Sequence, residues 1–223
     1  MWRLRRVAPA NQPDGAVIAP LYILYANFNC MLTFKYHKSI DKRCWHRLIL
    51  AKSMFGRKFP SAYKITSRNS EEAKSRLSEF SNIWKPVEKQ LLKGLAKIYS
   101  KAKIPTYINC YLNTSPYSMD DYQKGYISIT ARLKNPKKIR EIIIHELAHF
   151  LFRQAYAKYA LKIGYTKKQL ENLKEILTVL HKPTLGLNDA GYDIHKTQRT
   201  MALKLWEQRN NLEQVIFNLK NII

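Results

Sequence analysis

The pattern of large apolar and polar residues predicts two short strands in the middle of the chain. Tyr107–Asn113 alternates between large apolar and polar side chains, and Tyr126–Thr130 does so again. Such a period of two is typical of strands that bury one face. The polar segment between them is rich in turn-forming residues, so we expect a loop there that contains Pro116, Asp120, Asp121 and Gly125.

The N-terminal half combines strand-like and helical patterns. Leu21–Leu48 is rich in Tyr, Phe, Ile and Leu, and the spacing of its apolar residues predicts strand structure. Ser70–Lys101 instead shows the period of a long amphipathic helix or a helix pair. We expect Ser70 to cap the start of this segment and Pro86 to break or kink it.

The C-terminal half carries the start and stop signals of three helices. Asn135 is a preferred N-cap and is followed by a proline, so a helix should begin there and end near Gly164. Thr166 and Gln169 have the spacing of a capping box, which predicts a second helix that stops before Pro183. A last helix is expected after the second one. The three predicted helices cover about residues 136–163, 167–180 and 194–219.

Together these elements predict an α+β fold. We expect a small mixed or antiparallel sheet, at least one helix before it and a mostly helical C-terminal half. Seven glycines in 223 residues are few, which also favours helices. The chain divides into a basic N-terminal tail (1–15), a region with strands and amphipathic helices (16–104) and a C-terminal region (105–223) that carries the candidate chemistry.

The formal net charge of +23 comes from 39 Lys and Arg against 16 Asp and Glu. Such an excess attracts polyanions without sequence specificity, so nucleic acid, an acidic protein substrate and an anionic membrane surface all fit. The basic residues are spread along the chain, and no single cluster indicates a nucleic-acid-binding motif. A solvated basic surface is the alternative interpretation.

The cysteines and the N-terminal apolar run indicate in which cellular compartment the protein is expected. Three cysteines at irregular spacing, without a CxxC pair, favour neither a disulfide framework nor a cysteine zinc site. We therefore expect the reducing cytoplasm. The apolar run at residues 16–34 contains Pro20, Asn27 and Asn29, which favours buried strand structure over a membrane span. A membrane tether through this run is the alternative.

The strongest chemical signal is the run His145-Glu146-Leu147-Ala148-His149. Residues at i and i+4 share one helical face, so both imidazoles can bind one Zn²⁺ at about 2.0–2.1 Å. Glu146 lies about 100° round the helix, where it can act as general base and acid on a metal-activated water. The neighbouring residues are apolar nearly all round, which predicts a buried helix, and a metal would compensate for burying these polar groups. A chance match on a core helix is the alternative.

This motif resembles that of the zincin metallopeptidases, over about residues 105–200 of the chain. The resemblance implies a zincin-like fold, in which the motif helix packs under a sheet whose edge strand lines the substrate cleft. Tyr126–Thr130 would be that edge strand. The backbone of Ile127, Ser128 and Ile129 would then pair with an extended peptide substrate.

A catalytic zinc site needs a third protein ligand. The sequence after His149 lacks the glycine and third histidine of metzincins, so the site is similar to that of gluzincins, in which a Glu on the following helix completes the site. Glu175 is favoured over Glu171 because it lies in the more apolar part of its helix. The competing ligands are His181 and His195.

The same resemblance implies a group that stabilises the oxyanion of the reaction. In gluzincins it is a histidine or tyrosine beyond the third ligand, and His195 and Tyr192 are the candidates here. Thr178 or Asp189 could support the ligands through hydrogen bonds.

The sequence therefore favours a zinc-dependent peptidase in which His145, His149 and Glu175 hold Zn²⁺ and Glu146 transfers the protons. Two other hypotheses stay open. One is a basic nucleic-acid-associated protein with a structural or secondary zinc site, and the other is an inactive zincin-like interaction module. The presence of Glu146 argues against the second of these.

Overall fold

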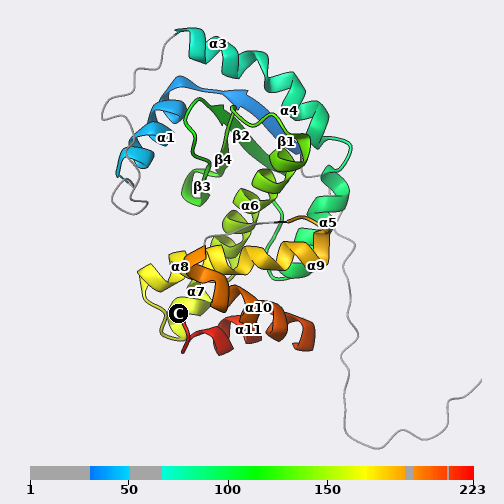
Figure 1. Ribbon diagram of the computed structural model, residues 1–223, viewed down its shortest axis with the longest axis vertical. Coiled ribbons are helices and arrows are strands. Elements are labelled where there is room, and N and C mark those ends of the chain that lie inside the picture. The colour runs from blue at the N-terminus through cyan, green and yellow to red at the C-terminus, as the bar shows by residue number, and fades with distance from the viewer. Residues whose placement is uncertain (1–30, 51–66, 189–192, 210) are drawn as a thin grey trace, which may run out of the picture.

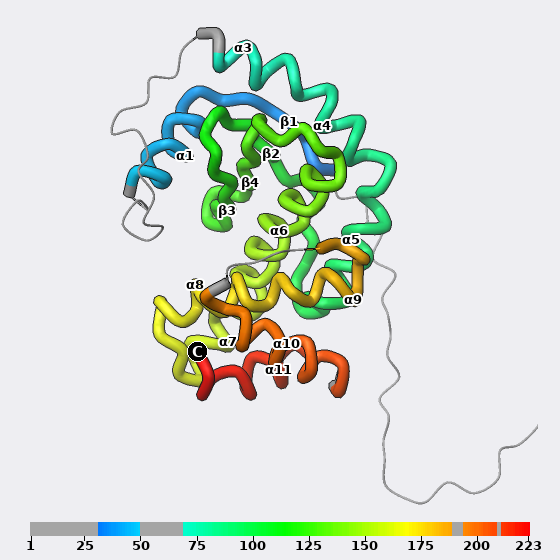
Figure 2. Tube along the Cα trace, viewed as in Figure 1, coloured from blue at the N-terminus to red at the C-terminus, as the bar shows by residue number. Residues whose placement is uncertain are grey.

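A computed structural model of the protein describes residues 31–50, 67–188, 193–209 and 211–223. These residues form a small four-stranded mixed sheet and a larger set of helices, so the predicted α+β class is confirmed (Figure 1). The long helix α6 (Pro136–Ala155) leads from the sheet to a layer of C-terminal helices (Figures 1 and 2). The predicted N-terminal tail, 1–15, and most of the apolar run lie outside the described residues.

The sheet has the order β1-β2-β4-β3. Its strands are β1 (Met31–Tyr36), β2 (Tyr107–Asn113), β3 (Met119–Asp121) and β4 (Tyr126–Thr130). The first three strands in this order are parallel, and β3 is antiparallel to β4. Both strands expected from alternation, β2 and β4, have the predicted bounds, because their apolar side chains face one buried core: Ile108, Cys110, Leu112, Ile127 and Ile129.

The prediction that Tyr126–Thr130 is the edge strand is wrong. β4 pairs with β2 on one side and with β3 on the other, and all five of its residues are buried. The edge on this side of the sheet is formed by β3, from the polar segment that was expected to be a loop. Three residues with two aspartates lack a strand pattern, and only their pairing with β4 makes them a strand.

The expectation of strand structure up to Leu48 is only partly correct. β1 is a strand, but α1 (Lys38–Leu50) is a helix. Its residues Ile40, Cys44 and Leu48 recur every four positions, which is helical spacing. Cys44 and Leu48 are buried, and Cys44 contacts Ser128 of β4, so α1 covers the sheet face opposite the main core.

The predicted helical segment 70–101 is three helices: α3 (Ser67–Ser75), α4 (Leu77–Trp84) and α5 (Glu88–Ile98). Pro86 lies between α4 and α5, as predicted. Ser70 lies inside α3, so its predicted role as the N-cap is wrong. The fully buried Phe80 and Trp84 attach α4 to the core beside β1.

The predicted caps of the motif helix and of the next long helix are confirmed. The Asn135 carboxamide oxygen accepts hydrogen bonds from the backbone N–H groups of Lys137 and Lys138 at the start of α6. Thr166 and Gln169 form the capping box of α8 (Lys167–Leu177). Before it, Gly164 has a φ of +99°, a conformation that favours glycine and ends α7 (Ala157–Lys162). The single helix expected over 136–163 is interrupted at Tyr156.

The last part of the chain differs from the prediction in two places. The chain continues from α8 through the 3-10 turn η2 (Thr178–Leu180) into α9 (His181–Leu185), which contains Pro183. A proline is tolerated there because the first helical turn needs no intrahelical N–H partner. The segment that was predicted as one last helix contains three elements: η3 (Asp193–His195), α10 (Lys196–Arg209) and α11 (Leu212–Leu219). Asn211 starts α11 by capping Glu213 and Gln214.

One core connects the sheet to the C-terminal layer. It extends from Leu32 of β1 to Leu219 of α11, so the regions 16–104 and 105–223 share a sheet and a core. Among the residues that the structure describes, none of the helices combines the length and the apolar character that crossing a membrane needs.

Candidate metal centre

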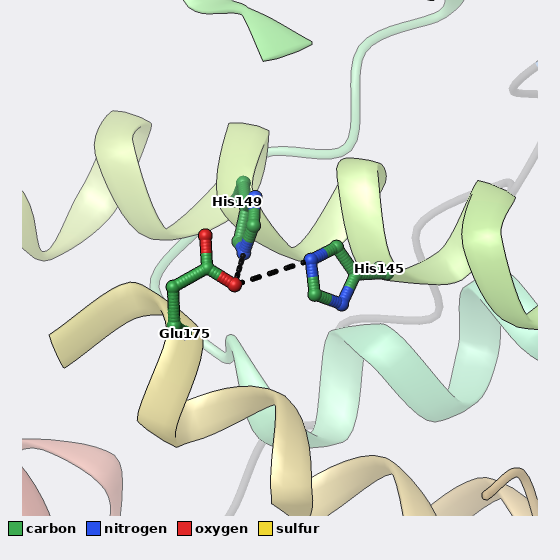
Figure 3. Close-up of side chains that lie close together, drawn as sticks. All are labelled: His145, His149 and Glu175. Atoms are coloured by element: carbon green, nitrogen blue, oxygen red, sulfur yellow. Dashed lines mark ion pairs between the residues drawn. The ribbon is translucent and has the colours of Figure 1, made fainter. Parts of the chain in front are cut away.

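Helix α6 presents His145, Glu146 and His149 from its middle turns. Its remaining residues are largely buried apolar side chains, which hold the helix between the sheet and α8. His149 and Glu146 are buried, and His145 is partly exposed. As Figure 3 shows, the two imidazoles project from α6 towards Glu175.

Helix α8 supplies Glu175 from the opposite side. Its Leu173, Ile176 and Leu177 are buried, and their packing directs the Glu175 carboxylate at α6. Glu175 Oε2 lies 3.4 Å from His145 Nε2 and 3.6 Å from His149 Nε2 (Figure 3). The three residues that the sequence singled out as ligands therefore meet at one point.

The atoms at this point have the spacing and chemistry of a metal site. In a tetrahedral site with metal–ligand distances of about 2.0–2.1 Å, two ligand atoms lie about 3.3 Å apart. The 3.4 Å and 3.6 Å separations are close to that value. His149 Nε2 and Glu175 Oε2 are also buried without a hydrogen-bond partner. A divalent ion with nitrogen and oxygen ligands would satisfy both atoms, so the residues fit a metal ion.

Lys174 lies behind these ligands. Its ammonium group is 2.9 Å from Glu175 Oε1 and 3.2 Å from His149 Nδ1, so it contacts the atoms of these two side chains that face away from the meeting point. Burial opposes its charge, but the carboxylates of Glu175 and Asp120 outweigh burial and raise the pKa of Lys174. The lysine therefore stays protonated and balances the charge of the acidic groups.

A second set of charges connects the edge strand to both helices. Arg153 of α6 donates from Nε to Asp120 Oδ2 of β3 at 2.9 Å. The same guanidinium makes two hydrogen bonds with Glu171 of α8, at 2.9 and 2.8 Å. The other Asp120 oxygen, Oδ1, lies 3.7 Å from His149 Nδ1. Asp120, Glu146 and His149 form a second group that could hold a cation.

Glu146 is suited to proton transfer. Burial, reinforced by the neighbouring charge of Asp120 and opposed by His145, raises the pKa of Glu146 to about 8. Its Oε2 lies 3.7 Å from His149 Nδ1. A carboxyl group that titrates near neutral pH can both accept and return a proton.

The protonation states of Glu175 and His149 favour metal ligation. Burial opposes the ionisation of Glu175, yet the nearby imidazole of His145 and the charge of Lys174 lower its pKa to about 2. Burial and the charge of Lys174 lower the pKa of His149 well below its usual value. An ionised carboxylate and a neutral imidazole are the forms that bind a metal.

Neither group of described residues that could hold a cation contains Glu171, His181 or His195. Glu171 pairs with Arg153 and is half exposed. His181 is buried at the start of α9. His195, in η3, is buried, and burial lowers its pKa while the nearby charge of Glu175 raises it. His195 therefore lies close enough to Glu175 for its charge to act, whereas Tyr192 and Asp189 lie outside the described residues.

Thr178 supports the backbone of Glu175 rather than its carboxylate. Its hydroxyl donates to the Glu175 carbonyl oxygen at 2.7 Å, and the Arg199 guanidinium donates to that carbonyl at 2.8 Å. The backbone of Ile127, Ser128 and Ile129 does not form a sheet edge beside the site, because β4 is internal. The basis for assigning these three residues to substrate binding is therefore removed.

Sequence reasoning missed Asp120, Arg153 and Lys174. Asp120 was placed in a loop, and no local pattern shows that β3 brings it to α6. The sequence contains a weak signal for Lys174. This lysine lies next to a glutamate in the apolar part of a helix, and a charged group that is buried there needs a partner. Comparisons of the chain with protein-family models, with curated proteins and with solved structures find no match.

Proposed function

We propose that the protein is a zinc-dependent peptidase with a zincin-like arrangement of the gluzincin type. One observation carries the proposal: two histidine nitrogens and one glutamate oxygen meet at a point that fits a metal ion, next to the buried carboxyl group of Glu146. His145, His149 and Glu175 would hold the ion, and Glu146 would transfer the protons.

Peptide hydrolysis needs a nucleophile and two proton transfers. A bound Zn²⁺ would supply Lewis-acid chemistry, which polarises a peptide carbonyl and makes water more acidic at neutral pH. Glu146 would accept the proton of the water that attacks the carbonyl carbon. It would then give this proton to the amine that leaves when the C–N bond breaks. His195 is the candidate for a hydrogen bond to the carbonyl oxygen as negative charge develops on it.

The substrate would lie along β3 rather than β4. β3 is the antiparallel edge of the sheet, and Asp120 of this strand lies 3.7 Å from His149. An extended peptide can add to such an edge through backbone hydrogen bonds. The substrate-binding role expected for the backbone of Ile127–Ile129 would therefore move to the backbone of Met119 and Asp120.

Metal analysis combined with peptide hydrolysis tests the proposal. We expect one zinc per chain and cleavage of a mixed peptide library that a chelator stops and added Zn²⁺ restores. Glu146→Gln should lower kcat by about 10²–10⁴ while zinc content is unchanged. The matched control is Glu141→Gln, because Glu141 lies five residues earlier on α6 and pairs with Lys138.

Different failures lead to different conclusions. Full activity of Glu146→Gln would exclude the proposed role of this residue. Zinc binding by the wild-type protein without any cleavage would favour an interaction module on the same scaffold. No zinc in the protein, and no uptake from solution, would exclude the metal site itself.

A second candidate function is nonspecific binding of a nucleic-acid backbone. Lys89, Lys93 and Lys97 are exposed on α5 and recur every four residues, so they follow one side of the helix. None of them forms an ion pair with another described residue. Such a row of cations can replace the counterions of a phosphate backbone.

Fluorescence polarisation with a labelled DNA duplex tests this second function. Changing Lys89, Lys93 and Lys97 to Gln should weaken binding at low salt and flatten its salt dependence. The control changes Lys124, Lys134 and Lys204, which are exposed on separate parts of the chain, and removes the same charge. Equal loss in both triple variants would show that net charge, rather than the α5 row, governs binding.

A further inference from the structure

Three groups face the Nδ1 atom of His149. Lys174 Nζ is 3.2 Å away, and Asp120 Oδ1 and Glu146 Oε2 are each 3.7 Å away. The other ring nitrogen, Nε2, points to the meeting point with Glu175. Because a neutral imidazole carries one proton, the partner of Nδ1 decides which nitrogen has a lone pair for a metal.

The contact with Lys174 and metal binding require different tautomers. An ammonium group only donates, so Nδ1 must accept from Lys174, and the imidazole proton is then on Nε2. That proton points to where the metal would bind. Ligation through Nε2 therefore requires the proton on Nδ1, where it needs an acceptor in place of the lysine.

Asp120 is better placed than Glu146 to be this acceptor. Its Oδ2 accepts from Arg153, which is itself held by Glu171, so the position of the other oxygen next to His149 is fixed. The Asp120 side chain is only 6% exposed, so water competes little for Oδ1. Glu146 in the proposed function must face the substrate, and a lasting hydrogen bond to His149 would hinder its proton transfers.

We propose that Asp120 positions His149 for metal binding by accepting its Nδ1 proton, and that Lys174 gives up His149 when the metal binds. Lys174 keeps its 2.9 Å contact with Glu175, so no buried charge is left without a partner. The edge strand β3 thereby supports the metal centre through one aspartate. This inference rests on the proposed metal site.

Zinc affinity of matched aspartate variants tests the inference. Removing a carboxylate that orients a ligating histidine typically weakens metal binding by about 10- to 100-fold. We expect this loss of Zn²⁺ affinity for Asp120→Asn, measured by competition with a chromophoric chelator. Asp121→Asn is the control: it removes the same charge from the next residue of β3, but Asp121 pairs with Arg43. Its zinc affinity should equal that of the wild-type protein.

The ¹⁵N NMR signals of His149 supply a readout that a merely structural role would not move. The zinc-bound wild-type protein should carry the imidazole proton on Nδ1, and the metal-free protein on Nε2. Equal zinc affinities of the two variants, or zinc-bound His149 with its proton on Nε2, would overturn the inference alone. No zinc binding by the wild-type protein would overturn the proposed function as well.

Discussion

Glu171 and Glu175 lie one turn apart on α8, yet their partners differ. Glu171 pairs with Arg153 and is half exposed, whereas Glu175 lies between two histidines and a largely buried lysine. A glutamate in the surroundings of Glu171 contributes a surface ion pair, whereas a glutamate in the surroundings of Glu175 can ligate a metal. Because four residues turn a helix by about 400°, the two side chains share one face of α8, and the different groups opposite them decide their surroundings.

This difference predicts unequal effects of the same substitution. Glu175→Gln should weaken zinc binding by about 100-fold or more, because it removes a charged ligand. Glu171→Gln should change zinc affinity much less. Titration of both variants with Zn²⁺ in the presence of a competing chelator measures the difference, and similar affinities would contradict the assignment of Glu175.

The buried thiols give a second prediction for single residues. Burial raises the pKa of Cys44 to about 12 and that of Cys110 well above its usual value. Since the thiolate is the reactive form, raising the pKa from 9.0 to about 12 lowers its fraction at pH 8 by about 1000-fold. In a Cys30→Ser variant, a thiol reagent should label no cysteine at pH 8 until denaturant is added, and residual labelling should increase with pH. Rapid labelling of the folded variant would contradict this burial.

At the scale of elements, the position of the site depends on how helices approach one another. α5 and α9 pack closely where Gly94 faces Leu185. α9 follows directly after η2 and α8, so this contact helps to hold the segment that carries Glu175. A Cβ atom at position 94 would overlap the Leu185 side chain.

Gly94→Ala should therefore destabilise the protein although alanine favours helices. The helical preference contributes about 1 kcal/mol, whereas overpacking costs about 1–3 kcal/mol. In a Leu185→Ala background the same change should be neutral or stabilising, because the overlap is gone. A double-mutant cycle of unfolding free energies in urea measures this, and an identical effect in both backgrounds would show that the two helices do not meet there.

For the whole molecule, the candidate ligands belong to two layers. His145 and His149 are on α6 beneath the sheet, and Glu175 is on α8 in the C-terminal layer (Figures 1 and 3). A metal that binds all three connects the layers in the folded state only. Binding is then coupled to global stability.

Zinc should accordingly raise the melting temperature. At a free concentration of about 100 times Kd, the ion contributes about 2.7 kcal/mol, which for a chain of this size corresponds to a shift of about 5–10 °C. Differential scanning fluorimetry with zinc, and then with excess chelator, measures the shift and its reversal. A similar shift in His145→Ala would mean that zinc acts elsewhere on the protein.

Local sequence signals were sufficient to predict several helices and strands. The alternation in Tyr107–Asn113 and Tyr126–Thr130, the Asn135 cap and the Thr166–Gln169 capping box all predicted what the structure contains, because each depends on residues a few positions apart. The helix α1 was missed although its four-residue spacing is visible. The strand β3 could not be found from its sequence, since pairing with β4 alone creates it.

The sequence by itself determined the motif on α6, because helical periodicity is a local property. The resemblance to gluzincins, together with the apolar neighbours of Glu175, made Glu175 the favoured third residue. Only the tertiary structure decided that Glu175 lies 3.4 Å from His145, that β3 rather than β4 is the edge, and that Asp120, Arg153 and Lys174 surround the same point. The three side-chain contacts join residues 25 to 33 positions apart. Their geometry follows from the packing of separate elements, which no local pattern records.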